Sequence, residues 1–134
     1  MYLLDTNVVS ELRRLRPHGA VVDWMRKTDD AHIHLSAVTL GEIQAGIEIT
    51  REQDPGRATV IEAWADQVAD SFDILPMDAR IFRIWARLMH GQAEALYEDA
   101  MIAATAAAHG LTVVTRNVRD FSPFGVATLD PFLT

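Results

Sequence analysis

The chain contains 134 residues, is 49% hydrophobic and carries a formal net charge of −7. These values fit one globular domain, residues 1–134, with a core of its own. The charge argues against a protein that merely coats nucleic acid, which would be basic. An acidic protein can still act on a phosphodiester if a metal neutralises the contact.

Targeting and redox signals are missing from the sequence. No apolar run reaches the ~18 residues that cross a membrane. No basic segment precedes the first apolar residues, so we expect neither a membrane partner nor a secretory signal. The lack of cysteine excludes disulfides and thiolate zinc sites, and it fits a cytoplasmic protein.

The first half of the chain predicts two strands separated by helices. Apolar runs at residues 2–5 and 32–35 show little polar alternation, which is typical of strands buried in a parallel sheet. Pro17 and the Pro55-Gly56 pair mark element boundaries. Helices are predicted over residues 7–14, 19–27 and 38–53.

The second half continues the alternation. Apolar runs predict strands at residues 72–75 and 112–115, with a weaker one at 126–129. Strands that alternate with helices predict an α/β fold, here a three-layer sandwich with a central, mainly parallel sheet of four to five strands. Ligands of such folds bind beyond the carboxyl ends of strands. The remaining predicted helices are residues 57–69, 79–92 and 98–109.

Four acids lie where solvent exposure explains them poorly: Asp5, Glu42, Asp99 and Asp120. Asp5 closes the first strand, and Asp120 follows the fourth strand after a polar loop. Isolated buried acids are costly unless a positive charge meets them. If the four converge, they indicate a divalent cation, because carboxylate oxygens suit Mg²⁺ or Mn²⁺. Such a cation can activate water and neutralise charge on a phosphoryl oxygen.

Helical geometry turns two of these acids inward. Glu42 lies opposite the polar face of its helix. Asp99 falls in the first turn of a helix that is apolar nearly all round and therefore buried. The predicted neighbours of Glu42 on its face are Val38, Ala45, Gly46 and Ile49, and those of Asp99 are Ile102, Ala103 and Ala106.

Each acid also has a purely structural explanation. Glu42 could pair with an arginine. Asp99 could stabilise a helix N-terminus, although the neighbouring Glu98 suits that role better. Thr6 or Asn7 could cap the first helix, which leaves the acid before them unexplained. The polar loop after the fourth strand could be an Asx-rich turn and nothing more.

Four segments resemble the PIN domain (PilT N-terminus) family of metal-dependent ribonucleases. They are LLDTNV at residues 3–8, LGEI at 40–43, EDAMIAATA at 98–106 and VTRNVRDF at 114–121. They occur in family order, and the last two are similar to the FitB-like branch of VapC toxins. The resemblance implies a PIN-like fold and a Mg²⁺-dependent endoribonuclease, with Mn²⁺ as a possible substitute, acting as the toxin of a VapBC-type toxin–antitoxin pair.

The resemblance also implies roles for single residues. Asp5, Glu42 and Asp99 would be metal ligands. Asp120 would be a fourth catalytic acid, although Asn117 in the same loop competes for that position. Polar support is expected from Thr6, Asn7, Thr115 and Asn117.

Several partners are implied in the same way. They are an RNA substrate, a VapB-type antitoxin that inserts a peptide into the acidic site, and a second copy of the chain in a homodimer. The alternative is a catalytically inactive PIN-like module that binds RNA or protein. A phospho-accepting receiver domain would need a lysine near a late strand, and Lys27 is the only lysine.

Arginines supply candidate RNA contacts. Arg80, Arg83 and Arg87 share one helical face, which could follow a phosphate backbone or simply be solvated. Arg13 lies near the proposed site in sequence but could instead cap a helix C-terminus, and Arg116 lies in the last polar loop.

Two further groups have ordinary explanations that we favour. His32 and His34 share a strand face and could bind zinc, but ordinary polar strand residues are expected. An apolar stripe on the helix at residues 57–69 is expected to pack in the core or at an interface, and it could serve a homodimer or an antitoxin. It consists of Val60, Ile61, Trp64 and Val68.

Overall fold

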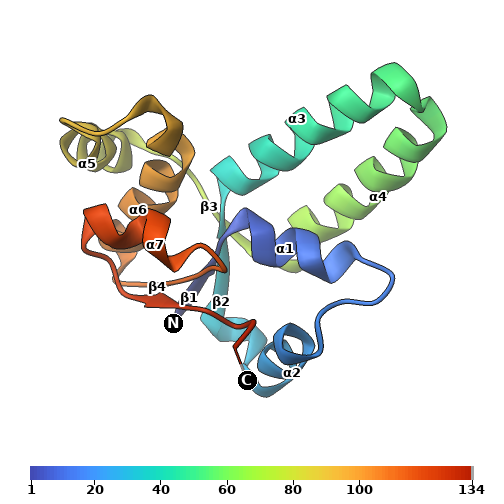
Figure 1. Ribbon diagram of the computed structural model, residues 1–134, viewed down its shortest axis with the longest axis horizontal. Coiled ribbons are helices and arrows are strands. Elements are labelled where there is room, and N and C mark those ends of the chain that lie inside the picture. Colours follow the sequence, from blue (N-terminus) through green and yellow to red (C-terminus); the bar gives the residue numbers. More distant parts are fainter. Residues whose placement is uncertain (134) are drawn as a thin grey trace.

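A central sheet of parallel strands organises the molecule (Figure 1). The computed structural model describes residues 1–133, and the strands in that range are β1 (Tyr2–Leu4), β2 (Ile33–Ser36), β3 (Asp73–Leu75), β4 (Thr112–Val114) and β5 (Thr128–Leu129). Their order across the sheet is β3-β2-β1-β4-β5, and every pairing is parallel. The predicted α/β architecture is confirmed, including the weak fifth strand.

Helices connect the strands and cover the sheet. They are α1 (Thr6–Arg13), α2 (Gly19–Lys27), α3 (Ala37–Gln53), α4 (Pro55–Ser71), α5 (Ala79–Met89), α6 (Tyr97–His109) and α7 (Val118–Phe121). The four-residue α7 was not predicted, because so short an element has no periodicity to detect. No helix within residues 1–133 has the length and apolar character needed to cross a membrane.

The two faces of the sheet bury separate apolar cores. Neighbouring strand residues point to opposite faces, so Leu4 packs into a core with α1 to α4, while Leu3 packs against α6 and α7. Val114 and Val113 divide in the same way. Because both faces are covered, the strands show little polar alternation, which explains the pattern seen in the sequence. The three-layer prediction is confirmed.

The strand order brings distant segments to one edge. The chain runs from β1 outward to β2 and β3, then returns to place β4 on the other side of β1. Leu4 pairs with Val114 at the carboxyl ends of these two strands, and the Asp5 N–H donates to the Val114 carbonyl at 2.9 Å. In doubly wound sheets, such a reversal of direction opens a crevice beyond the strand ends.

Helices α3 and α4 extend together beyond the sheet (Figure 1). Asp54 joins them: it ends α3, and its Oδ1 accepts the Arg57 N–H of α4 at 3.1 Å. The prediction that Ile49 lies beside Glu42 on a buried face is wrong, because Ile49 is 65% exposed while Ile43 and Ile47 are buried. Beyond the sheet edge, the outer turns of α3 have little to pack against, so the buried stripe follows α4 instead.

Other sequence expectations need smaller corrections. Helix α5 ends at Met89 rather than at residue 92, since Gly91 takes a left-handed φ of +80° that interrupts the helix. His32 belongs to a short 3₁₀ turn before β2, and His34 bonds Asp73 at 2.7 Å, so the two histidines form no common site. The α4 stripe is divided, because Val60 is 70% exposed and Val68 is buried.

Candidate active site

Asp5 is a buried carboxylate at the carboxyl end of β1. Its Oδ1 accepts the Thr6 backbone N–H at 2.8 Å, and its Oδ2 accepts the Thr115 hydroxyl at 2.8 Å and the Asn7 amide at 3.2 Å. The expectation that Thr6 or Asn7 caps α1 is wrong, since Asp5 itself is the N-cap. Asp5 is therefore oriented by groups from both ends of the chain, and it is only 5% exposed.

The loop after β4 is attached to the start of α1. The Thr115 hydroxyl accepts the Asn117 N–H at 2.9 Å and the Asn7 amide at 3.3 Å. The Asn7 carbonyl oxygen in turn accepts the Arg116 N–H at 3.3 Å. These bonds hold the loop that leads to Asp120 against Asp5, so the loop is more than a free-standing Asx turn.

Glu42 reaches the same edge from the second turn of α3. Its Oε1 accepts the Thr6 hydroxyl at 2.9 Å, and the buried Thr39 hydroxyl lies 3.2 Å from that of Thr6. The ion pairs found within residues 1–133 include none to Glu42, so the arginine pairing considered from the sequence is not observed. Thr6 thus links the two acidic segments.

Asp99 and Glu98 lie side by side in the first turn of α6. Asp99 is half-buried, and Glu98 is exposed. The negative charge of Glu98 raises the pKa of both Glu42 and Asp99. Glu98 is therefore a member of the acidic group, although the sequence predicted it only as a helix-end residue. In the sequence, only the position of Glu98 next to Asp99 indicates that it belongs to this group.

Burial and the charges of neighbouring acids raise the pKa values of three of these carboxylates. Burial raises the pKa of Glu42 to about 7, with repulsion from Glu98, Asp5 and Asp99 adding to it. Burial also raises the pKa of Asp99 to about 6, assisted by Asp5, Asp120 and Glu98. The pKa of Asp5 is raised by burial, opposed by its bonds from Thr115 and Thr6.

Asp120 and Asn117 occupy different places in the final loop. Asp120 lies in the first turn of α7, and its charge raises the pKa of both Asp5 and Asp99. Asn117 precedes α7 and makes no capping bond through its side chain. Asp120 is therefore coupled to the acidic centre through its charge, and Asn117 is connected to it through its backbone N–H, which the Thr115 hydroxyl accepts.

The donor set is chemically suited to a divalent cation. Carboxylates that raise one another's pKa form a site of concentrated negative charge. Across the described part of the chain, no three acids or histidines converge tightly enough to enclose an ion. The Asp5 and Glu42 oxygens instead accept bonds from Thr115, Thr6 and Asn7. Metal binding would require these side chains to turn toward one another.

The predicted arginines do not form one cluster. Arg80, Arg83 and Arg87 line a shallow depression on α5, at the other end of the molecule from the tip of α4 (Figure 1). Arg116 lies in the loop beside Asn7, with its guanidinium carbon 4.4 Å from the ring centroid of Phe132. Arg13 lies at the end of α1.

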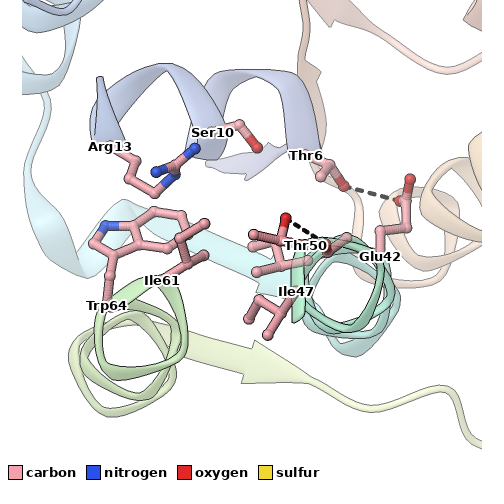
Figure 2. Close-up of a pocket in the computed structure, with 10 residues that line it drawn as sticks. Thr6, Ser10, Arg13, Glu42, Ile47, Thr50, Ile61 and Trp64 are labelled. Carbon is pink, nitrogen blue, oxygen red and sulfur yellow. Dashed lines mark hydrogen bonds between the residues drawn. The ribbon is translucent and has the colours of Figure 1, made fainter. Parts of the chain in front are cut away.

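A groove runs from the acidic edge between α1, α3 and α4 (Figure 2). Its volume is about 230 Å³. Thr6 and Glu42 line one end, and Arg13 and Trp64 line the other (Figure 2). From the sequence, Trp64 was predicted only as part of a packing stripe, because no local pattern shows that α4 lies against α1.

The fold and the site together define an α/β domain with acids gathered at the carboxyl edge of a parallel sheet. The PIN domain family model matches residues 2–124, and the chain therefore belongs to the PIN domain family. This confirms the resemblance found in the sequence.

Curated relatives cover nearly the whole chain. Toxin FitB of Neisseria gonorrhoeae is 34% identical over 98% of this chain and 99% of its own length. VapC ribonuclease Y4jK of Sinorhizobium fredii is 37% identical over 97% of this chain and 94% of its own. The similarity to FitB supports the predicted FitB-like branch.

Solved structures give the same result. The crystal structure of FitAcB from Neisseria gonorrhoeae contains a chain that is 34% identical and superposes with a TM-score of 0.87, with 100% of both chains covered. VapBC2 from Rickettsia felis, at 20% identity and a TM-score of 0.74, shares the fold.

Proposed function

We propose that this protein is a Mg²⁺-dependent endoribonuclease and the toxin of a VapBC-type toxin–antitoxin pair. The observation that carries the proposal is that Asp5, Glu42, Asp99 and Asp120 lie at one edge of the sheet within range of one another's charge, where burial and mutual repulsion raise the pKa of the first three. Relatives of full length bear the names toxin and ribonuclease. Family membership and acidic chemistry thus support the same activity.

Asp5, Glu42 and Asp99 would hold the cation, and Mn²⁺ would be an alternative to Mg²⁺. A divalent cation at such a site supplies charge neutralisation on the phosphate and activation of water. Thr115 and Asn7 orient the Asp5 carboxylate, while Thr6 orients Glu42. Asp120, the fourth catalytic acid in this proposal, is exposed and free to accept a proton from water or to support a second cation.

Cleavage of RNA by the purified protein tests the activity. We expect Mg²⁺-dependent cleavage that EDTA abolishes and that falls at least about a hundredfold in Asp99→Asn, because one metal ligand is lost. Asp66→Asn removes an exposed carboxylate from α4 and is the matched control, with activity unchanged. Activity that survives EDTA, or that is equal in Asp99→Asn, would contradict the proposal.

The second candidate is a catalytically inactive PIN-like module that binds RNA or protein. The observation that favours it is the absence, within the described residues, of three acids close enough to enclose an ion. Calorimetric titration with Mn²⁺ separates the two functions. Binding that is lost in Asp99→Asn supports the enzyme, and no heat of binding at millimolar Mn²⁺ supports the inactive module.

An antitoxin is the proposed protein partner. Solved structures with similar chains include a toxin–antitoxin complex from Klebsiella pneumoniae and VapBC-5 of Mycobacterium tuberculosis, which is described as a member of the VapBC family of toxin–antitoxin systems. A peptide with a basic side chain would neutralise the acidic edge in place of the metal. We expect growth arrest on expression of this chain to be relieved by the protein encoded beside it, and arrest that persists would contradict the pairing. The homodimer remains a further proposal, which sedimentation equilibrium tests directly.

A further inference from the structure

The groove between α1, α3 and α4 has an aromatic and cationic far end. The guanidinium carbon of Arg13 lies 6.0 Å from the ring centroid of Trp64, over its face. Arg13 is exposed, and in the described residues it has neither an ion pair nor a side-chain hydrogen bond. A guanidinium stacked near an indole, with its donors free, can contact a base and a phosphate together.

Positive charge gathers at this end despite the acidic chain. Arg13, Arg14, Arg16 and Arg57 line one adjoining depression. Arg13 and Arg57 also line a second, together with Asp54 and Ile61. Of these four, Arg14 alone has an ion pair in the described range, at 3.4 Å to Glu11. Charge of this sign attracts phosphates rather than a basic peptide.

The groove is continuous with the proposed reaction centre. Thr6 and Glu42, which line its near end, belong to the acidic centre, while Arg13 lies two turns along α1 from Thr6 (Figure 2). Two turns of helix rise about 10 Å. A strand that reaches the acids through this groove therefore passes the Arg13–Trp64 pair within a few nucleotides.

We propose that this groove is a binding subsite for single-stranded RNA, in which a base stacks on the Arg13–Trp64 pair and neighbouring phosphates contact Arg13, Arg16 and Arg57. The subsite rests on the proposed ribonuclease function and names its substrate as unpaired RNA. A base within a duplex is already stacked on its neighbours, so only an unpaired base can take this position.

Fluorescence anisotropy with a labelled twelve-nucleotide oligouridine tests the subsite. EDTA is present throughout, so binding is measured without cleavage. We expect Arg13→Ala and Trp64→Leu each to weaken binding about tenfold, or ~1.4 kcal/mol. Arg13→Ala should also lower the slope of log affinity against log salt by about one, while Trp64→Leu leaves it unchanged. A hairpin duplex of equal length should bind more weakly than the oligouridine.

Matched controls lie elsewhere on the surface. Arg26→Ala removes an exposed arginine from α2, and Phe82→Leu removes an exposed aromatic from α5. Both should bind the oligouridine as the wild type does. Arg13→Lys keeps the charge, so it replaces Trp64→Leu as the test variant if Trp64→Leu lowers the melting temperature. It should retain the salt slope and lose part of the affinity, because ammonium lacks the planar stacking surface.

Three outcomes would overturn the subsite. The first is wild-type RNA affinity in both Arg13→Ala and Trp64→Leu, and the second is an equal loss of RNA affinity in Arg26→Ala. The third is weaker antitoxin binding by Arg13→Ala and Trp64→Leu with RNA affinity unchanged. Failure of the subsite is distinct from failure of the proposed function. Mg²⁺-dependent cleavage with unchanged RNA binding in Arg13→Ala rejects the subsite alone. Groove-dependent RNA binding by a protein that never cleaves RNA rejects the activity alone.

Discussion

The Thr115 hydroxyl donates a 2.8 Å hydrogen bond to Oδ2 of Asp5, although 110 positions separate the two residues in sequence. Both are buried. The bond exists because β1 and β4 are neighbours in the sheet and end at the same level, with Leu4 beside Val114. It joins the first and last segments of the acidic centre and determines which way the Asp5 carboxylate points.

Removing this bond should destabilise the protein and disturb the site. Thr115→Val keeps the side-chain shape but leaves the buried Asp5 carboxylate without its hydroxyl donor. We expect a loss of about 1–3 kcal/mol in the free energy of unfolding, measured by urea denaturation at pH 8. Thr115→Ser retains the hydroxyl and should lose less than half as much. Equal losses in both variants would assign the effect to packing of the methyl group.

The pKa of Glu42 predicts a stability that depends on pH. Its pKa is raised from 4.5 to about 7, so between these values the native state binds more protons than the unfolded state. The free energy of unfolding therefore falls as pH rises from 4.5 to 7 and is then constant in respect of this group. Asp99 adds to the fall between pH 3.8 and about 6.

Glu42→Gln should remove part of that fall. The amide oxygen can still accept the Thr6 hydroxyl, but it carries no charge to desolvate. We expect a melting temperature about 2–4 °C above wild type at pH 8 and no difference at pH 4. Glu52→Gln changes an exposed glutamate of the same helix and should match the wild type at both pH values. A Glu42→Gln gain that is equal at pH 4 and pH 8 would refute the electrostatic origin.

Metal affinity should rise with pH for the same reason. Ligand carboxylates must be deprotonated, so binding at pH 6.5 releases protons chiefly from Glu42, whose pKa is about 7. Calorimetric titration with Mn²⁺ in two buffers of different ionisation enthalpy counts those protons. We expect release at pH 6.5 and almost none at pH 8.5. Equal proton release at the two pH values would exclude Glu42 and Asp99 as ligands.

The arginines of α5 supply a separate prediction. If Arg80, Arg83 and Arg87 contact phosphates, as their common face predicts, the triple alanine variant should lower the salt slope of RNA binding by up to about three. The comparison is the double variant Arg26→Ala with Lys27→Ala, which removes two exposed cations from α2 and should leave the slope unchanged. An unchanged salt slope in the α5 variant would show that these arginines contact solvent and not RNA.

The sequence alone determined most of the fold because its signals are local. Short apolar runs with little polar alternation are typical of strands in a covered parallel sheet, and β1 to β5 were all predicted from such runs. The acids could be selected in the same way, since Asp99 lies in the first turn of a helix that is buried nearly all round. Boundaries such as that of α5 depended on one glycine at φ +80° and were less accurate.

Only the tertiary structure decided how those segments meet. Glu98 joins the acidic group, and Arg13 faces Trp64 across a groove, because the strand order and the α3–α4 hairpin bring separate segments together. The exposure of Ile49 has the same origin, since the hairpin extends past the sheet. The helical period shows which face of a helix is apolar. The segment that packs against that face depends on contacts between distant parts of the chain, and a local sequence pattern does not contain them.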